Sequence, residues 1–463
     1  VSVSSVVSTR PRFVGGPIFE LFCLGKMRAA DAQRVKSTRP SRFRGRKKGG
    51  EGSAKPSAAA LRRRARRIPD AVLNDAELNA AIRKLPLNYE FEVHKTVWRL
   101  QQENASVVAL QFPEGLLMYA CVLCDIFEHF CGVRVIIMAD VTYGACCVDD
   151  FTARALGADF LVHYGHSCLV TVDTTTIKTL YVFVDVGIDV DHLVATIKLN
   201  FPDPTQRLTL LGTIQFGRAI HAANDALKAA GWGTVDVPQC RPLSAGEVLG
   251  CTSPTIAEGT CDALIFVADG RFHLESAMIA NPELPAYRYN PFDKAITRER
   301  YDTVQMKKNR LNAIERARGA TTYGVILGTL GRQGNTGILN HICAMLTARG
   351  HPHIVLLLSE IFPAKLTLLK EVDAWVQIAC PRLSVDWGHF FTKPLLSTYE
   401  FEVAMDRTLF REVYPMDYYR KDGGSWSNNC TERGDPGGAK EEGGCACAAG
   451  EAGGEQSETG ACK

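Results

Sequence analysis

Three cysteines, Cys146, Cys251 and Cys380, each stand where a strand is expected to end. Cys146 follows the apolar run 133–139, which predicts a buried strand, and Asp149 beyond it is a good N-cap for a helix. In a parallel sheet this strand-to-helix turn lies at the carboxyl edge, where α/β proteins place their ligands. The start of a helix also stabilises a thiolate. The sequence therefore predicts a reactive or ligating cysteine at this turn.

A short sequence motif containing Asp occurs three times, each time just before an apolar strand. Its Asp serves as a reference position for the cysteines. Its copies are Gly157-Ala-Asp-Phe-Leu-Val-His, Thr260-Cys-Asp-Ala-Leu-Ile-Phe and Glu371-Val-Asp-Ala-Trp-Val-Gln. Cys146 and Cys251 lie 13 and 11 residues before the Asp of their copies, and Cys380 lies 7 residues after its own. Ser253 and Pro254 predict a helix directly after Cys251.

The repeats and the length of 463 residues predict three domains at roughly 150 residues each. The expected fold class is α/β, with three similar α/β units and parallel-type sheets around a pseudo-threefold centre where the cysteines converge. We place the domains at residues 67–204, 205–317 and 318–420. A basic disordered arm, 1–66, precedes them, and a disordered Gly/Glu-rich tail, 421–463, follows.

The charge of the chain is distributed unevenly. The net charge is +3, yet residues 1–67 alone carry 18 Lys and Arg against three acidic residues. Such a basic arm is usually disordered, and we favour a solvated tail over a nucleic-acid partner. Met27 is the first plausible initiator, so residues 1–26 are treated as an untranslated extension and left out of the fold reasoning.

The cysteine pattern and the apolar runs indicate where the protein works. Sixteen cysteines are scattered without regular disulfide spacing, and no secretory signal is evident. This usage is typical of the reducing cytoplasm. The apolar runs fall well short of the ~20 residues that a membrane span requires, so no membrane segment is expected.

Three converging thiolates suit either a structural zinc with a fourth ligand or an iron–sulfur cluster with one iron left open. Zinc sites normally use close pairs of ligands, whereas 105 and 129 residues separate these three cysteines along the chain. A cluster tolerates ligands that arrive from separate directions. Unrelated buried thiols remain the plain alternative.

Two histidines have metal-like spacing. His163 and His166 stand near Cys168, and we expect all three on one loop. Because no second pair of ligands accompanies them, we predict that they line a pocket and do not bind zinc. His273 and Tyr143 are likewise expected to be hydrogen-bonding neighbours of the site.

Six motifs in one order resemble a known family. They are Val141-Thr-Tyr-Gly-Ala-Cys-Cys-Val-Asp-Asp, His163-Tyr-Gly-His-Ser-Cys, Gly250-Cys-Thr-Ser-Pro, Asp269-Gly-Arg-Phe-His, Gly328-Thr-Leu-Gly-Arg-Gln-Gly and Ala379-Cys-Pro-Arg-Leu-Ser. Together they closely resemble the diphthamide biosynthesis protein one family, the catalytic subunits of eukaryotic diphthamide synthase. The resemblance covers about residues 67 to 420.

The resemblance implies a function. Cys146, Cys251 and Cys380 would ligate a four-iron, four-sulfur (4Fe-4S) cluster whose fourth iron binds S-adenosylmethionine, while Cys147 is not assigned as a ligand. One electron would cleave the sulfonium to a 3-amino-3-carboxypropyl radical, which adds to C2 of a histidine on translation elongation factor 2. This is the first step of diphthamide biosynthesis. The implied partners are that factor, a paralogous second subunit in a heterodimer, and a small zinc-containing electron donor.

Other residues at the predicted strand ends are candidates for holding the cosubstrate. They are Gly270, Arg271, Gly328, Thr329, Gln333, Ser359, Glu360, Pro381 and Arg382. The glycine-rich turn 328–334 lets backbone approach an adenosyl or carboxylate group. Arg271 and Arg382 can clamp a carboxylate, with a salt bridge between domains as the alternative. Glu360 would hold the amino group.

Two other functions compete with this transferase. A quinolinate-synthase-like dehydratase shares a three-unit architecture and a three-cysteine cluster, and would turn over a small molecule without S-adenosylmethionine. A noncatalytic scaffold, like the paralogous second subunit, is the other alternative. The presence of all three cysteines argues against a scaffold, which could lose one.

Overall fold

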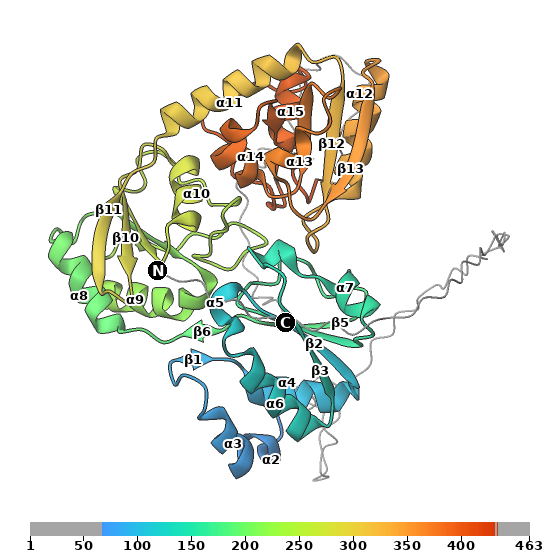
Figure 1. The fold of residues 1–463 in the computed structure, drawn as a ribbon. Coiled ribbons are helices and arrows are strands. Elements are labelled where there is room, and N and C mark those ends of the chain that lie inside the picture. The colour runs from blue at the N-terminus through green and yellow to red at the C-terminus, as the bar shows by residue number, and fades with distance from the viewer. Residues whose placement is uncertain (1–66, 431–432, 434–463) are drawn as a thin grey trace, which may run out of the picture. The chain divides into compact units, whose positions relative to one another are not determined.

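The computed structural model describes residues 67–430 and residue 433. Three sheets rich in parallel strands follow one another along this part of the chain, and we call each sheet with its helices a unit (Figure 1). The basic arm 1–66 and the cysteines at positions 445, 447 and 462 lie outside the described residues. Within the described part, no helix combines the length and apolar character that crossing a membrane requires.

The first unit is a four-stranded parallel sheet in the order β3-β2-β4-β5. Its elements are α2 (Asp70–Leu73), α3 (Ala76–Ile82), β1 (Tyr89–Glu90), α4 (Val93–Glu103), β2 (Val107–Gln111), α5 (Glu114–Leu117), α6 (Ala120–Cys131), β3 (Arg134–Met138), η1 (Ala145–Cys147), α7 (Asp150–Ala155), β4 (Phe160–Tyr164) and β5 (Lys178–Val182). α4 and α6 pack together, and their apolar faces join β2 and β4 in one core.

The second unit is a five-stranded sheet in the order β11-β10-β9-β7-β8, parallel except for the β10–β11 pair. Its elements are β6 (Asp185–Val186), α8 (Val190–Asn200), β7 (Leu208–Gly212), η2 (Ile214–Phe216), α9 (Gly217–Ala229), β8 (Val235–Asp236), β9 (Ala263–Val267), α10 (Phe272–Ala280), β10 (Ala286–Asn290) and β11 (Ala295–Glu299). β6 also pairs with β1 of the first unit in a small antiparallel ribbon.

The third unit is a four-stranded parallel sheet in the order β13-β12-β14-β15. Its elements are α11 (Thr303–Arg318), β12 (Tyr323–Gly328), α12 (Thr336–Ala348), β13 (His353–Leu358), α13 (Pro363–Leu366), β14 (Ala374–Ile378), α14 (Pro381–Trp387), η3 (Gly388–Phe390), β15 (Leu395–Leu396) and α15 (Thr398–Ala404). The α/β class with parallel sheets is therefore confirmed. The pseudo-threefold arrangement stays a prediction.

The repeated Asp has the same structural task in each unit. Asp159 accepts hydrogen bonds from the Ser106 and Val107 amides, at the start of β2. Asp262 accepts from the Arg207 amide just before β7, and Asp373 accepts from the amides of residues 321 and 322 just before β12. Each carboxylate thus ties the loop before one central strand to the start of its neighbour.

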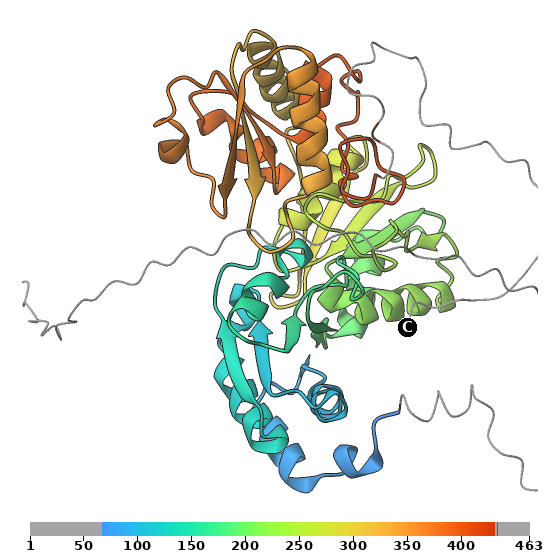
Figure 2. The same cartoon turned by 90° about the vertical axis from the view of Figure 1, so that its right-hand side faces the viewer.

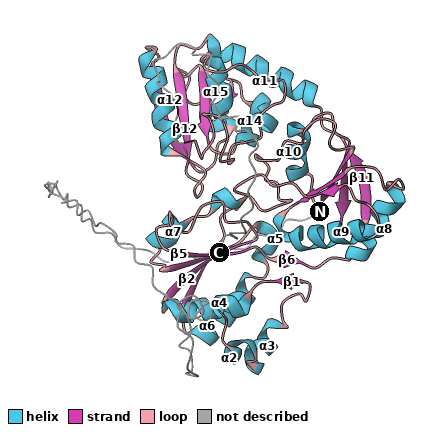
Figure 3. Ribbon diagram, turned by 180° about the vertical axis from the view of Figure 1, so that it is seen from behind, coloured by secondary structure: helices cyan, strands magenta, loops and turns pink. Residues whose placement is uncertain are grey.

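Two helices belong to the unit that follows the one we predicted for them. α8, placed in the domain 67–204, packs its apolar face against β7 and α9 in the core of the second unit (Figure 2). α11, placed in the domain 205–317, lies beside α15 and joins the core of the third unit (Figure 3). The predicted boundaries assigned these helices to the preceding unit, whereas the apolar face of each helix is buried in the core of the unit that follows.

Two local predictions are also corrected. No helix follows Cys251, because the backbone there binds distant partners: the Ser253 amide donates to the Met416 carbonyl. The prediction of a disordered tail from residue 421 is wrong for residues 421–430, which are described and include the buried Trp426; most of the remaining tail lies outside the described residues. The indole of Trp426 donates to Asp417 at 2.8 Å, which anchors this segment to the third unit.

The placement of α11 can be tested by substitution. Ile314 is 1% exposed in the core of the third unit, so Ile314→Ala should cost about 3 kcal/mol of unfolding free energy. Hydrogen exchange should accelerate in β12 and β14. Leu311→Ala, on the same helix but 40% exposed, is the matched control and should change little. Faster exchange confined to β7 and β9 would contradict the assignment.

Candidate functional site

Cys146 lies where the sequence predicted it, between a parallel strand and a helix. The chain leaves β3 at Met138 and reaches Cys146 in the short helix η1. The Asp149 side chain then accepts a hydrogen bond from the Thr152 amide at 3.0 Å and caps α7, as the sequence predicted. The cysteine loop is therefore held between two regular elements.

A loop of the third unit closes on the Cys146 loop. The Arg332 amide donates to the Cys146 carbonyl at 2.9 Å, and its guanidinium forms a bidentate ion pair with Asp150, both bonds being 2.7 Å. The Gln333 side chain donates to the Cys147 sulfur at 3.3 Å. Gly331 has φ of 56°, and a Cβ there would lie 2.4 Å from the Cys147 backbone. The glycine-rich turn thus makes a close approach to the backbone of the first unit, and its approach to an adenosyl or carboxylate group stays a prediction.

Cys380 lies just beyond β14, at a strand end as predicted, whereas Cys251 lies in the long loop between β8 and β9 and not directly at the end of a strand. Cys251 is 8% exposed and lies in the core that the second and third units share. Cys380 is the N-cap of α14, and Pro381 occupies the first turn of that helix. The Gln377 side chain donates to the Cys380 carbonyl at 3.0 Å and fixes the end of β14. Cys380 therefore lies at a helix start, a position that stabilises a thiolate.

The three thiols are electrostatic neighbours. A hydrogen bond with Cys147, burial, and the charges of Cys251 and Cys380 all raise the pKa of Cys146 well above its usual value. Burial and the neighbouring Cys380 raise the pKa of Cys251 to about 12. Burial likewise raises the pKa of Cys380. Cys251 is thus buried and Cys146 and Cys380 are half-buried, and the charges of Cys251 and Cys380 act on Cys146. The convergence of all three sulfurs on one cluster stays a prediction.

Cys147 behaves differently from its neighbour. Its thiolate accepts from Cys146, which lowers the pKa of Cys147 to about 7 although burial acts in the opposite direction. Backbone groups of Gly144 and Tyr143 and the Gln333 amide add further hydrogen bonds to its sulfur. Of the two neighbouring thiols, the surroundings therefore favour ionisation of Cys147.

Tyr419 completes the site, and the sequence analysis missed it. Burial, followed by the charges of Cys146, Cys251 and Cys380, raises the pKa of the Tyr419 hydroxyl well above its usual range. Its backbone amide donates to the Thr252 hydroxyl at 3.1 Å, next to the second cysteine. Tyr419 stands at the end of the chain segment that resembled the family and in none of the six motifs, so no spacing rule indicated it.

The donor set fits a cluster better than a single ion. Among the described residues, no group of three or more His, Cys, Asp or Glu side chains surrounds one point closely enough for a metal ion. A zinc ion needs its thiolates within about 2.3 Å of one centre, whereas each thiolate of a cluster binds its own iron. Buried thiols that raise one another's pKa also favour a positively charged occupant, which removes the repulsion between thiolates.

Arg382 forms the salt bridge between units that the sequence left as an alternative to a carboxylate clamp. Its guanidinium bonds Asp386 of its own helix at 2.9 Å and Glu275 of the second unit at 2.5 Å. It also donates to the carbonyls of Gly250 and Phe272, at 3.2 and 2.8 Å. Arg382 is 2% exposed and therefore ties the Cys380 helix to the residue before Cys251.

The remaining cosubstrate candidates are spread around these strand ends. Arg271 pairs with Glu275 and Glu299, and the amide of Gly270 bonds Asp269. Gly328 packs its Cα face against Ala379, and the Thr329 amide donates to the end of β13. Ser359 and Glu360 are exposed just beyond β13. The structure gives these residues no shared contact, so their role stays a prediction.

Three histidines line the same region, with one correction. His163 lies on β4 and not on a loop, because the strand continues to Tyr164. Its Nδ1 bonds Gln111 at 2.8 Å, and its Nε2 bonds the Nδ1 of His166 at 3.1 Å. Burial lowers the pKa of His163 well below its usual value, that of His166 to about 3 and that of His273 to about 4. All three rings are therefore neutral near pH 7.

Comparisons with known proteins agree with this architecture. Residues 112–415 match the model of a family described as diphthamide synthesis protein. A relative from Dictyostelium discoideum is 53% identical over 371 residues, which are 79% of this chain and 78% of that protein. A human relative is 55% identical over 368 residues, 79% of this chain and 83% of its own. Both are named 2-(3-amino-3-carboxypropyl)histidine synthase subunit 1.

A solved structure shares the fold. Dph2 from Pyrococcus horikoshii, crystallised with a 4Fe-4S cluster, superposes with a TM-score of 0.60 at 24% identity. The superposition covers 72% of this chain and 94% of that one. A second crystal structure of the same protein gives a TM-score of 0.58. At this identity the likeness concerns the fold.

The ion pair between Asp150 and Arg332 predicts a pH-dependent stability. Burial raises the pKa of Asp150, but the ion pair with Arg332 and hydrogen bonds from Thr176 together more than offset it, so the folded-state pKa lies below the usual value. The pair therefore stabilises the fold above the unfolded pKa of about 4, and this contribution is lost as pH falls through the folded pKa. At pH 7, Asp150→Asn should lower the unfolding free energy by about 2 kcal/mol.

Denaturant unfolding at pH 7 and near pH 3 measures this difference. It should shrink at the lower pH as wild-type Asp150 becomes protonated. Asp149→Asn is the matched control, because Asn caps a helix as well as Asp does. A difference that stays equal at both pH values would rule out the charge of Asp150 as its source.

Proposed function

The chain belongs to the diphthamide synthesis protein family, and from this premise we propose that it transfers a 3-amino-3-carboxypropyl group to a histidine. The proposed donor is S-adenosylmethionine and the proposed acceptor is C2 of a histidine on translation elongation factor 2. The names of the relatives support the product, a 2-(3-amino-3-carboxypropyl)histidine. This reaction would be the first step of diphthamide biosynthesis.

One observation carries the proposal: a cysteine from each of the three units lies within electrostatic reach of the other two, with Cys251 buried and Cys146 and Cys380 half-buried. We infer that Cys146, Cys251 and Cys380 hold a 4Fe-4S cluster. These three cysteines would hold the cluster, which would supply one electron for reductive cleavage of the sulfonium of S-adenosylmethionine. A relative fold that was crystallised with this cluster supports the choice.

The chain's own residues position the ligands and keep water out. Arg332 and Gln333 fix the Cys146 loop, and Arg382 fixes the Cys251 and Cys380 loops against each other. Arg382 also stacks over the Phe272 ring at 4.3 Å, and that ring lies against Gly250, the residue before Cys251. A radical transfer needs a dry enclosure, since water exclusion prevents side reactions.

The cosubstrate is proposed to bind at the same strand ends. Gly270, Thr329 and the exposed Ser359 and Glu360 are the candidates there with least internal pairing. Arg271 has a half-exposed guanidinium and could still reach a carboxylate. Gln333 and Arg382 are the candidates least available to bind the cosubstrate, because both already bond the cysteine loops.

The partners and the location are proposals as well. The relatives are called subunit 1, which supports our proposal of a paralogous second subunit in a heterodimer. A small zinc-containing protein is the proposed electron source. We place the complex in the cytoplasm, because the reducing conditions there keep Cys146, Cys251 and Cys380 as the free thiols that the structure contains.

The ligand assignment predicts the effect of one substitution. After anaerobic reconstitution with iron and sulfide, Cys251→Ala should lose the cluster's spin-resonance signal and the transfer of labelled aminocarboxypropyl to elongation factor 2. Cys261→Ala is the matched control, since Cys261 is a buried thiol of the same unit, 7% exposed, that bonds only the Ala263 carbonyl. It should keep both the signal and the transfer.

Two results would count against the proposal. Full transfer by Cys251→Ala would remove Cys251 from the ligand set. A cluster signal without any transfer in the wild-type complex, under reducing conditions and with the second subunit present, would favour the noncatalytic scaffold.

A further inference from the structure

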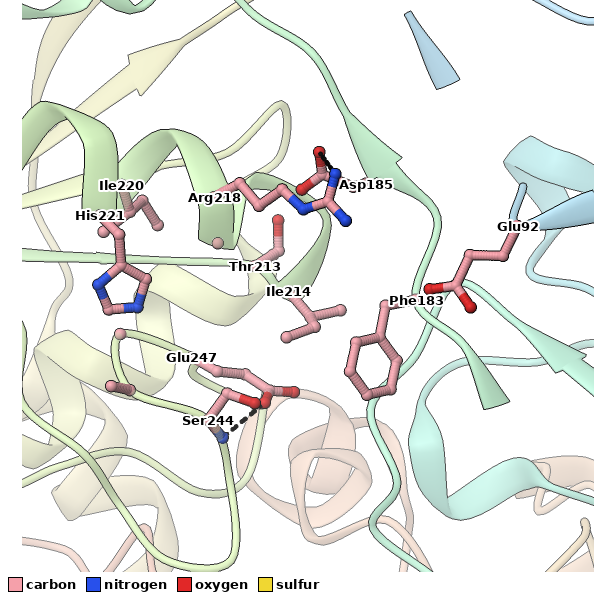
Figure 4. A pocket seen from close by; sticks show the side chains of 13 residues that line it. Glu92, Phe183, Asp185, Thr213, Ile214, Arg218, Ile220, His221, Ser244 and Glu247 are labelled. Carbon is pink, nitrogen blue, oxygen red and sulfur yellow. Dashed lines mark hydrogen bonds and ion pairs between the residues drawn. The ribbon is translucent and has the colours of Figure 1, made fainter. Parts of the chain in front are cut away.

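A cavity of about 210 Å³ opens between the first and second units, at the carboxyl end of β7 (Figure 4). Side chains of both units line it, and those that matter here are Glu92, Phe183, Asp185, Thr213, Arg218 and Glu247. None of them is among the cosubstrate candidates or the cysteine ligands. The cavity has no part in the function proposed above.

Glu247 brings a buried negative charge to the cavity wall. It is 3% exposed, and its Oε2 accepts from the Ser244 amide at 3.0 Å. Among the described residues no Lys, Arg or His forms an ion pair with it, whereas Glu92 pairs with Lys95 and Asp185 pairs with Arg218. Burial raises the pKa of Glu247, as expected for a carboxyl without a cation.

Thr213 is a second and independent sign of a ligand. It is 7% exposed, lines the cavity, and its hydroxyl has no hydrogen-bond partner. Buried hydroxyls normally find a partner, so a spare one on a cavity wall is suited to a polar group of a bound molecule. Figure 4 shows it on the same side of the cavity as Arg218 and Asp185.

The geometry excludes a bare metal ion and favours an organic cation. No group of three acidic or other ligating side chains among the described residues is close enough to hold a metal. The cavity is also larger than a single ion requires, and Phe183, Ile214 and Ile220 give it apolar walls. The positive charge of Arg218 is already directed at Asp185, 3.7 Å away, which leaves Glu247 as the uncompensated charge.

We propose that this cavity binds an ammonium group carried on a short alkyl chain. The Glu247 carboxylate serves as its counter-charge, and the Thr213 hydroxyl accepts one of its hydrogen bonds. The alkyl chain lies against Ile214 and the Phe183 ring, where an ammonium also gains from the ring's electron density. Either a free amine or a lysine side chain of a polypeptide supplies this chemistry.

The cavity is connected to the cysteine site through the backbone. The Gly212 amide donates to the Gly246 carbonyl at 2.8 Å, and the Val248 amide donates to the Gly212 carbonyl at 3.1 Å. Glu247 is thereby fixed alongside β7, only four residues before Cys251. A ligand on Glu247 therefore contacts the segment that carries the second cysteine.

Isothermal titration calorimetry on the full chain tests the proposal directly. n-Butylamine should give saturable binding, while n-butanol, which lacks the charge, and n-butyrate, which has the opposite charge, should give none at equal concentration. Binding of butyrate in place of butylamine would overturn the assignment of a cation site. No transfer assay is involved, so the result is independent of the function proposed above.

Variants assign the binding to the cavity. Glu247→Gln keeps the acceptor for Ser244 but removes the charge and should weaken butylamine at least tenfold; Thr213→Val should weaken it several-fold. Glu315→Gln, an exposed carboxylate on α11, is the control and should bind like wild type. Unchanged binding by Glu247→Gln would refute the proposal. If that variant does not fold, Thr213→Val decides, because Val has nearly the same shape.

A second titration separates the two sources of the ammonium. Nα-acetyl-lysine amide presents a lysine side chain within a short stretch of peptide backbone. Binding comparable to butylamine identifies a polypeptide lysine as a suitable occupant, whereas binding of butylamine alone identifies a free amine. Failure of both compounds to bind contradicts the proposal.

Discussion

Two arginines of the third unit, Arg332 and Arg382, hold the cysteine loops together, and the site depends on them. The three thiols repel one another as soon as they ionise, so no attraction among the sulfurs themselves brings them together. Arg332 bonds Asp150 and the Cys146 carbonyl, and Arg382 bonds Glu275 and the Gly250 carbonyl. The third unit is thus bonded to both of its neighbours by contacts that lie within a few residues of each cysteine.

These contacts are of the kind that fixes geometry more than it adds stability. The cost of removing the two charges from water offsets much of the attraction in a buried ion pair. A guanidinium that makes two parallel hydrogen bonds nevertheless permits few alternative orientations. Each arginine also stacks on an aromatic ring, Arg332 on Phe151 at 3.9 Å and Arg382 on Phe272 at 4.3 Å. These contacts fix both the orientation of the cysteine loops and the distances between them. A site whose ligands are widely spaced along the chain requires both.

The sequence predicted what depends on local pattern. The strands before Cys146 and Cys380, the Asp149 cap and the repeated Asp were all visible, because apolar runs and capping residues act over a few positions. The sequence did not predict the unit to which α8 and α11 belong. The apolar face of an amphipathic helix predicts that the face is buried, but not which sheet it packs against. Tyr419 was missed for the same reason: its contact with the cysteines spans 168 residues or more for two of them.

The places of α8 and α11 also bear on how the site is assembled. Each helix leads directly into the central strand of the next sheet, so the chain crosses between units before these helices, near residues 183–189 and 300–302. The first crossing holds β6, which pairs back to β1, and Asp185 and Phe183, which line the cavity. The seam between the first two units thus includes backbone pairing and a cavity, whereas the third unit is attached to both through charged side chains and shares an apolar core with the second. A seam of this kind can accept a ligand without disturbing the arginine contacts that hold the three sulfurs.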